Sequence, residues 1–321
     1  MKLDHPFRKF YNSDSYVNFH KYPLPIFPYL LEIEPTNACN IDCLFCGRQA
    51  MKRPIAYLDY EIYKKIIDEA SQYDCFEGIS SFSGWGEPLL HQHIFKMIEY
   101  ANNKNLLTSI FTNGLLLNNE NIIKLMDSGI DHIKISLQGA NVKEYDILRK
   151  SGVYDFVVEN VKKLVNYRNK NNYKAFIQAS TSITDEPEYE VKDFVHFWEN
   201  IVDEIYVDYT KFQRLLDVDR IKKYLDTKKN VLNEKGEIRG SYKEKTFRYK
   251  RCVDVHVRLV VHSDNTIPIC CSDFRHEMKI GNVKDSSLKE IWESKKLSSI
   301  RKTLNEDIRK IAFCKLCQNL R

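Results

Sequence analysis

The sequence lacks the features of membrane, secreted and nucleic-acid-binding proteins. No apolar run approaches the ~20 residues that a helix needs to span a bilayer. The first 28 residues mix Lys, Arg, Asp, Tyr and Phe without a continuous apolar core, so they are unlike a secretory signal. The formal net charge of +5 is too small to indicate a nucleic-acid partner. We therefore expect a cytoplasmic globular protein with no membrane and no nucleic-acid partner.

Internal repeats and low-complexity tracts are also absent, but one short segment is strongly basic. Residues 228–251 hold nine Lys or Arg against three Glu, a net charge of +6 that exceeds that of the whole chain. We interpret this segment as a solvated linker. A site for an acidic group, such as a phosphate or a carboxylate-rich peptide, is the alternative.

Short apolar segments alternate with longer amphipathic ones, which predicts βα units and a parallel sheet. Six such units are compatible with an open doubly wound sheet or with an incomplete barrel. The predicted strands are Tyr29–Glu34, Gly78–Ser83, Leu107–Thr112, His132–Leu137, Lys174–Ile183 and Glu204–Tyr209. The predicted helices are Asp59–Gln72, His91–Asn103, Glu120–Ser128, Asp155–Arg168 and Glu188–Asn200.

The alternation stops near residue 215, and the chain then changes character. Residues 216–251 read as a basic linker with one helix near Val218–Leu225. Val257–His262 and Thr266–Cys271 flank a turn-forming Ser-Asp-Asn cluster and predict a β-hairpin. A helix over Ser286–Leu304 follows, with apolar residues at helical spacing.

Nine cysteines in a chain without an export signal favour metal binding over disulfides, because the cytosol keeps thiols reduced. Seven of them fall into two groups, and Cys75 and Cys271 are left over as structural residues. The first group is Cys39, Cys43 and Cys46; the second is Cys252, Cys270, Cys314 and Cys317.

The first group forms a C-x3-C-x2-C triplet within Glu34-Pro-Thr-Asn-Ala-Cys-Asn-Ile-Asp-Cys-Leu-Phe-Cys-Gly47, directly after a predicted strand. Three thiolates on one loop can hold three irons of a [4Fe-4S] cube and leave the fourth iron open for an outside ligand. The alternative is a zinc loop or a set of buried thiols, although zinc sites usually require four ligands.

The triplet resembles that of the radical S-adenosylmethionine (SAM) superfamily, whose open iron chelates SAM. The resemblance implies an α/β fold, a partial (β/α)6 TIM-type barrel over residues 29–215, preceded by an N-terminal extension of residues 1–28. It also implies reductive cleavage of SAM to a 5′-deoxyadenosyl radical. A reducing partner such as flavodoxin or ferredoxin would supply the electron.

Two further motifs match the superfamily at the ends of successive strands. Ser83-Gly-Trp-Gly-Glu-Pro88 resembles the Gly-Gly-Glu-Pro motif that binds the amino group of SAM, which implies cofactor-binding roles for Gly86 and Glu87. Trp85 departs from the small residue often found at its position. Thr112-Asn-Gly114 ends the third predicted strand, where related enzymes line the cofactor pocket.

Three more residues are assigned to the SAM pocket by the same resemblance. Ser136, at the end of the fourth predicted strand, and Arg149, in the following segment, match a pair that holds the carboxylate and ribose of SAM. A guanidinium fork suits a carboxylate. Phe45, beside the last cysteine of the triplet, matches an aromatic residue that packs on the adenine.

The second cysteine group resembles the C-terminal SPASM/twitch region of these enzymes, over residues 252–321. Cys252, Cys270, Cys314 and Cys317, with Ile280-Gly-Asn-Val283, follow that pattern and imply one auxiliary [4Fe-4S] cluster in a small domain of hairpin and helix. Cys271 is an alternative ligand to Cys270, and a zinc ribbon is the alternative use of all four thiols.

The resemblance implies an oxidoreductase whose substrate class the sequence leaves open. An auxiliary cluster offers an electron acceptor, which favours oxidation of a small molecule such as a sugar or another alcohol; no spacing selects a base among Asp208, Tyr209 and Asp254. A SPASM-type maturase of a ribosomal peptide is the first alternative. Only 28 residues precede the first predicted strand, too few for the leader-peptide module of many maturases, so we expect a small molecule. A non-catalytic iron–sulfur or zinc scaffold is the more distant alternative.

Overall fold

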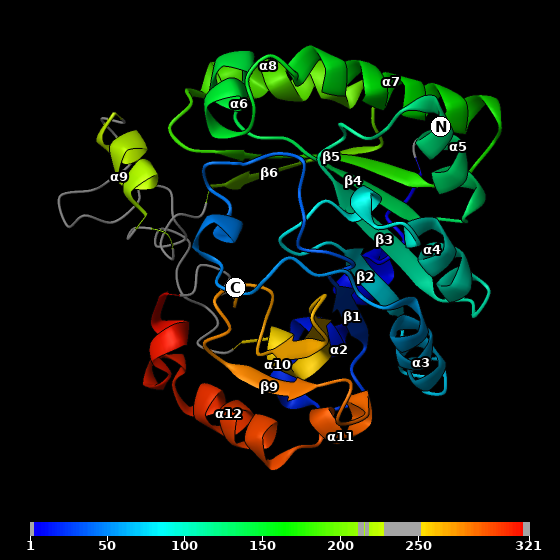
Figure 1. Cartoon of the computed structure of the whole chain (residues 1–321), viewed down its shortest axis with the longest axis vertical. Helices are drawn as coiled ribbons and strands as arrows, with labels where there is room; N and C mark the ends of the chain where they lie inside the picture. Colours follow the sequence, from blue (N-terminus) through cyan, green and yellow to red (C-terminus); the bar gives the residue numbers. More distant parts are fainter. Residues whose placement is uncertain (1–2, 211–214, 216–217, 228–251, 317–321) are drawn as a thin grey trace.

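A parallel sheet of seven strands forms the framework of the protein (Figure 1). The computed structural model describes residues 3–210, 215, 218–227 and 252–316. Within the sheet the strand order is β6-β5-β4-β3-β2-β1-β7. The strands are β1 (Leu30–Ile33), β2 (Gly78–Phe82), β3 (Leu107–Thr112), β4 (His132–Ser136), β5 (Phe176–Ile183), β6 (Glu204–Tyr209) and β7 (Arg258–Val261).

The strand order distinguishes the two architectures that the sequence left open. Each strand from β2 to β6 lies beside its predecessor and runs parallel to it, whereas a doubly wound sheet reverses its order partway. The edge strands β6 and β7 are not paired with each other among the described residues, so the sheet stays open. The partial barrel and its six predicted strands are therefore confirmed.

The predicted helices between the strands begin within three residues of the predicted positions, and their apolar residues pack in the core of the sheet (Figure 1). Asp59 caps its helix by accepting from the backbone N–H groups of Glu61 and Ile62, at 2.9 and 3.0 Å. The five predicted helices are confirmed, and one further helix, α6, was not predicted because it is short. These helices are α3 (Tyr60–Ala70), α4 (Ile94–Asn102), α5 (Asn119–Asp127), α6 (Val142–Leu148), α7 (Tyr154–Lys170) and α8 (Glu188–Glu199).

One predicted pairing is wrong. Val257–His262 was expected to form a hairpin with Thr266–Cys271, but its strand β7 instead pairs with β1, in parallel, from Leu30↔Arg258 to Ile33↔Val261. The chain does turn back after β7, because the His262 N–H donates to the Thr266 carbonyl at 2.9 Å. Pairing with the edge of β1 is favoured over the hairpin because it buries Val261 of β7 in the main core.

The C-terminal unit nevertheless contains the expected antiparallel pair and helix. β8 (Thr266–Pro268) pairs with β9 (Lys279–Asn282), and the helix predicted over Ser286–Leu304 is split into α11 (Leu288–Trp292) and α12 (Lys295–Glu306). The split occurs at Ser294, whose hydroxyl caps α12 by accepting from the Leu297 N–H at 3.2 Å.

Two contacts anchor this unit to the rest of the protein. Trp292 is fully buried, and its indole N–H donates to the Pro25 carbonyl at 2.9 Å. The Glu69 carboxylate of α3 accepts from the Leu288 and Lys289 N–H groups at 2.9 and 2.8 Å, and so caps α11. The C-terminal unit is thus held against both the barrel and the N-terminal segment.

The N-terminal segment and the linker complete the fold. The segment forms α1 (Arg8–Tyr11) and α2 (Asp14–Val17), and its aromatic residues pack against β1 and α10 (Asp254–Val257). In the linker, α9 (Asp219–Asp226) confirms the expected helix, while the basic segment 228–251 lies outside the described residues. Among the helices that the structure describes, none combines the length and apolar character needed to cross a bilayer.

Candidate active site

The cysteine triplet lies on the loop after β1, at the edge of the sheet where the parallel strands end. A backbone hydrogen bond of 3.1 Å from the Cys46 N–H to the Cys43 carbonyl tightens this loop. A second bond, 2.8 Å from the Leu44 N–H to the Leu148 carbonyl, ties it to the end of α6. Burial, together with the nearby thiols of Cys43 and Cys39, raises the pKa of the Cys46 thiol to about 12. Three clustered thiols that disfavour a bare negative charge are suited to a metal that binds them as thiolates.

Gly86 brings the segment after β2 into contact with the cysteine loop. A Cβ atom at Gly86 would lie 2.2 Å from the Thr36 carbonyl oxygen and 2.5 Å from that of Ala38, so no larger residue fits. The neighbouring Glu87 N–H donates to the Ala38 carbonyl at 2.8 Å. The close approach that the motif requires is therefore present.

The Glu87 side chain connects this segment to the end of β3. Its carboxylate is 2% exposed and accepts from the Thr112 hydroxyl at 2.8 Å and from the N–H groups of Asn113 at 2.8 Å and Leu89 at 3.2 Å. Burial outweighs these donors and raises its pKa to about 7. Three of about four lone-pair positions on the carboxylate are used, which leaves room for one donor from a ligand.

Asn113 extends the same network to the first cysteine. Its side-chain amide donates to the Asn40 side-chain oxygen at 2.8 Å and lies 4.0 Å from the Cys39 sulfur. The segments that follow β1, β2 and β3 thus meet in one hydrogen-bonded cluster, as the motifs predict.

Arg149 and Phe45 come together beside the triplet. The Arg149 guanidinium lies 5.5 Å from the centre of the Phe45 ring and donates to the Leu137 carbonyl at 3.2 Å. Its Nε is buried and has no hydrogen-bond partner among the described residues, which is unusual for a charged donor unless a ligand completes the site. Ser136 ends β4, opposite Ser180 on β5, and its hydroxyl has no partner within the described part of the chain. These free donors fit a carboxylate and hydroxyl groups of a bound cofactor.

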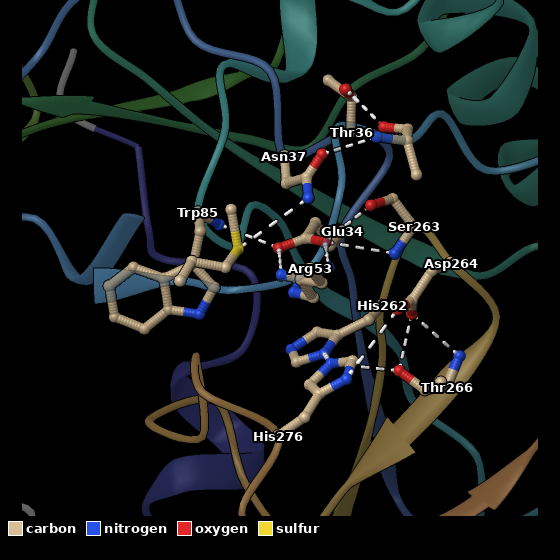
Figure 2. A network of polar contacts seen from close by, with 12 residues as sticks. Glu34, Thr36, Asn37, Arg53, Trp85, His262, Ser263, Asp264, Thr266 and His276 are labelled. Atoms are coloured by element: carbon tan, nitrogen blue, oxygen red, sulfur yellow. Dashed lines mark hydrogen bonds and ion pairs between the residues drawn. The ribbon is translucent and has the colours of Figure 1, made fainter. Parts of the chain in front are cut away.

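A buried ion pair between Glu34 and Arg53, which flank the triplet in the sequence, was missed by the sequence analysis (Figure 2). Arg53 donates to both carboxylate oxygens of Glu34 at 2.5 and 2.6 Å, and both side chains are less than 5% exposed. Glu34 also accepts from the Trp85 N–H at 3.0 Å and from the Ser263 hydroxyl at 2.8 Å. Burial raises the pKa of Glu34, but these donors, above all Arg53, lower it to about 2. The pair joins the ends of β1, β2 and β7.

The second cysteine group lies in and around the C-terminal unit. The thiols of Cys252 and Cys270 are near enough to interact electrostatically, and burial raises the pKa of Cys270. Burial also raises the pKa of Cys271, as do Glu32 and Asp254, whereas Arg258 lowers it. Because Cys271 and Asp254 raise the pKa of Cys270 as well, Cys270 and Cys271 both remain candidate ligands.

The remaining members of the second group, and the residues considered as a base, have different surroundings. Cys314 is buried in the main apolar core, and Cys317 lies outside the described residues. Asp254, in α10, forms an ion pair of 3.0 Å with Arg258, the first residue of β7. It therefore lies at the amino end of that strand. Asp208 and Tyr209 lie at the carboxyl end of β6, on the same edge of the sheet as the triplet. Of the three, only these two have the position expected of a base.

Comparison with protein families accounts for both cysteine groups. The model of the radical SAM superfamily matches residues 33–197, about half of the chain, which includes the triplet and the Gly86 and Glu87 motif. The chain belongs to the radical SAM superfamily. The model of the SPASM iron–sulfur cluster-binding domain matches residues 252–318, which include the second group. This radical SAM enzyme therefore uses SAM, a SAM-binding [4Fe-4S] cluster and an auxiliary iron–sulfur cluster.

Two curated relatives differ in how much of the chain they match. A tungsten-containing aldehyde ferredoxin oxidoreductase cofactor-modifying protein from Pyrococcus furiosus is 28% identical over 49% of this chain and 44% of its own length. This radical SAM chain thus aligns with less than half of that relative. An S-adenosyl-L-methionine-dependent 2-deoxy-scyllo-inosamine dehydrogenase from Niallia circulans is 25% identical over 91% of this chain and 93% of its own length.

A solved structure supports the fold. Streptococcus suis SuiB bound to the precursor peptide SuiA superimposes with a TM-score of 0.64 over 93% of this chain and 72% of that one, at 19% identity. At this low sequence identity, the superposition shows that the radical SAM chain shares the fold of SuiB. Since it covers 93% of this chain, the shared fold includes the C-terminal unit.

Proposed function

We propose that this radical SAM enzyme oxidises a secondary alcohol of a small molecule, such as a sugar, to a ketone. The observation that carries the proposal is the match, along nearly the whole length of both chains, to the dehydrogenase from Niallia circulans. The cysteine count supports it, because only four cysteines remain for auxiliary clusters once the triplet and the two structural thiols are set aside. One auxiliary cluster suffices to accept the one electron that the substrate radical releases in such an oxidation.

The residues divide into three roles in this proposal. Cys39, Cys43 and Cys46 would hold the first cluster. Cys252, Cys270, Cys314 and Cys317 would hold the second. Phe45, Gly86, Glu87, Ser136 and Arg149 would bind SAM, with the free Nε of Arg149 directed to its carboxylate.

The chemistry follows from the roles. When bound, the first cluster and SAM supply a 5′-deoxyadenosyl radical, and the second cluster accepts one electron. Abstraction of the carbinol hydrogen leaves a carbon radical beside the hydroxyl group, and loss of one proton and one electron then gives the ketone. Asp208 and Tyr209, at the carboxyl end of β6, are the candidates to take the proton.

Isotope transfer tests the proposal directly. Reconstituted enzyme with dithionite and SAM is expected to move deuterium from a labelled carbinol carbon into 5′-deoxyadenosine, with one ketone formed per SAM cleaved. A panel of sugars and aminocyclitols, labelled at each carbinol position in turn, identifies the substrate. Ketone formation without deuterium transfer from any position would refute the proposal.

The second cluster provides a matched control. Cys252→Ser is expected to retain part of the SAM cleavage but to lose at least 90% of the ketone, because the substrate radical then lacks its electron acceptor. Equal loss of cleavage and ketone would show that the second cluster is structural or delivers the first electron.

Glu87 predicts a pH dependence for SAM binding. Its pKa of about 7 means that it is protonated below neutrality, whereas the carboxylate is the form that accepts best from the SAM amino group. The dissociation constant of SAM is therefore expected to rise as pH falls below 7, by up to about tenfold per pH unit. Anaerobic equilibrium dialysis between pH 8 and pH 6 measures it. Glu87→Gln should bind weakly but without this slope, and a flat wild-type profile would contradict the role of Glu87.

Maturation of a peptide is the second candidate, because the SuiB structure with its precursor peptide covers 93% of this chain. It predicts that deuterium reaches 5′-deoxyadenosine from a labelled peptide and from no sugar in the panel. The same isotope assay therefore separates the two substrate classes.

A further inference from the structure

Two histidines and an aspartate converge beyond the end of β7, outside both cysteine groups (Figure 2). One nitrogen of His262, one nitrogen of His276 and one carboxylate oxygen of Asp264 lie within 4.8 Å of one another. His262 and Asp264 leave β7 two residues apart, whereas His276 comes from the loop between β8 and β9. Neither the comparisons nor the proposed oxidation gives these side chains a role.

The loop that carries His276 is built to hold it in place. His276 has a φ of 57°, in the left-handed region that non-glycine residues seldom adopt. The buried Asp273 carboxylate fixes the loop, since it accepts from the N–H groups of Glu277 and Met278 at 2.8 Å each. The loop therefore holds His276 in a conformation that is uncommon for a residue other than glycine.

The three side chains already share a hydrogen-bond network. His262 Nδ1 and His276 Nε2 are 2.7 Å apart, and the Thr266 hydroxyl lies 3.1 Å from the same His276 nitrogen. That hydroxyl donates to Asp264 at 2.6 Å. At this distance one of the two imidazole nitrogens carries a proton and donates it to the lone pair of the other. Loss of that proton, or its transfer to the other nitrogen of its own ring, leaves two lone pairs that face the same small volume.

The charges around the network favour a cation. Arg53 is the nearest cation, and the Glu34 carboxylate neutralises it through two hydrogen bonds. Asp264 and Asp273 are the remaining charged groups that face His276. Burial, opposed by Glu34 and aided by Arg53, lowers the pKa of His262 to about 4, and burial also lowers the pKa of His276. Neutral imidazoles are the form that binds a metal.

We propose that His262, Asp264 and His276 form a third metal site, separate from both clusters, which binds one divalent transition ion. Two imidazoles and a carboxylate are a ligand set of zinc and of non-haem iron, and zinc is the ion of choice for a site without an assigned redox role. The Thr266 hydroxyl or a water completes four ligands. Asp264 and His276 are partly exposed, so an ion can enter from solvent.

Binding requires a small rearrangement that the loop allows. Zinc–nitrogen bonds of about 2.0–2.1 Å place two ligand nitrogens about 3.3 Å apart in a tetrahedral site, so the rings separate by roughly 0.6 Å and release the shared proton. The bound ion would then tie the end of β7 to the loop between β8 and β9, which lies within the unit that carries Cys270.

Zinc uptake by the fully reconstituted enzyme tests the proposal. After chelator treatment and anaerobic addition of zinc, gel-filtered wild-type protein is expected to retain about one zinc per chain with its iron content unchanged. His276→Asn, which suits the left-handed backbone, and Asp264→Asn should each weaken zinc binding at least tenfold. His196→Asn is the matched control, because His196 lies on α8 with a side chain 81% exposed.

The outcome does not depend on the variants alone. X-ray absorption at the zinc edge of the wild-type protein should show imidazole and oxygen ligands without sulfur. A sulfur-containing shell would place the zinc on cysteines and overturn the proposal. So would the absence of bound zinc at full iron loading, or equal retention in His276→Asn and His196→Asn.

Discussion

Replacement of Cys39, Cys43 and Cys46 by Ala is expected to reduce the iron content of the reconstituted protein from about eight to about four and to abolish formation of 5′-deoxyadenosine. The three thiols share one loop, and Asn113 and Leu148 hold that loop against β3 and α6. Their loss leaves the second cysteine group intact. We expect cleavage to fall by at least about a thousandfold, because the cluster that these three thiols would hold has the iron that is open to SAM.

Iron and sulfide analysis beside the cleavage assay measures this result. Cys75→Ala is the matched control, because Cys75 is a half-buried thiol whose sulfur contacts only the Phe27 carbonyl, at 3.4 Å, among the bonds that the structure describes. It should keep about eight irons and full cleavage. A triple variant that still cleaves SAM would refute the assignment, whereas a wild-type protein with about four irons would remove the second cluster.

Arg53→Leu is expected to destabilise the protein by about 3–5 kcal/mol, the range seen when one partner of a buried ion pair is removed. Glu34 is 1% exposed, and without Arg53 its negative charge keeps, among the donors that the structure describes, those of Trp85 and Ser263. The segments after β1, β2 and β7 would then meet at a buried charge that no cation compensates. Apparent melting temperature, measured anaerobically on reconstituted protein, should fall by roughly 10 °C.

An exposed ion pair in the same protein supplies the control. Arg8 and Glu204 are 2.6 Å apart but 48% and 35% exposed, so Arg8→Leu should cost less than about 1 kcal/mol. The double variant Arg53→Leu/Glu34→Gln should recover part of the loss, since the amide carries no charge to bury. Equal melting temperatures for the Arg53 and Arg8 variants would contradict this account of the buried pair.

Most of the barrel is predictable from the sequence because its signals are local. Strands such as Leu107–Thr112 and Glu204–Tyr209 have the same bounds in the structure as in the prediction. The pairing of Val257–His262, in contrast, depends on a partner that is distant in the sequence. Its turn residues and apolar pattern suit a hairpin, and only the free edge of β1, more than 220 residues earlier, draws it into the main sheet.

In the active site, too, some residues have a local sequence signal and others are identified only by contacts between distant segments. Spacing within Cys39–Gly47 and around Gly86 carries its chemistry in the sequence, and the structure brings these segments together. Arg53 has no such signal, because nothing in a lone arginine after the triplet indicates a partner at Glu34. His276 has no such signal either, since one of its neighbours in space, His262, lies 14 residues earlier in the sequence. Contacts between segments that no motif links can only be found in three dimensions.

The pairing of β7 with β1 also bears on how the chain folds during synthesis. β1 is among the first strands to be made, yet its second neighbour, Arg258–Val261, is translated about 225 residues later. At roughly 5–20 residues per second, β1 stays an open sheet edge for about 10 to 45 s on the ribosome. Leu30 and Ile33, which are fully buried in the folded protein, belong to that open edge until β7 has been synthesised. A nascent chain that stops before residue 258 therefore exposes an apolar, parallel-pairing edge to other chains, and we expect such fragments to aggregate rather than to persist as free barrels.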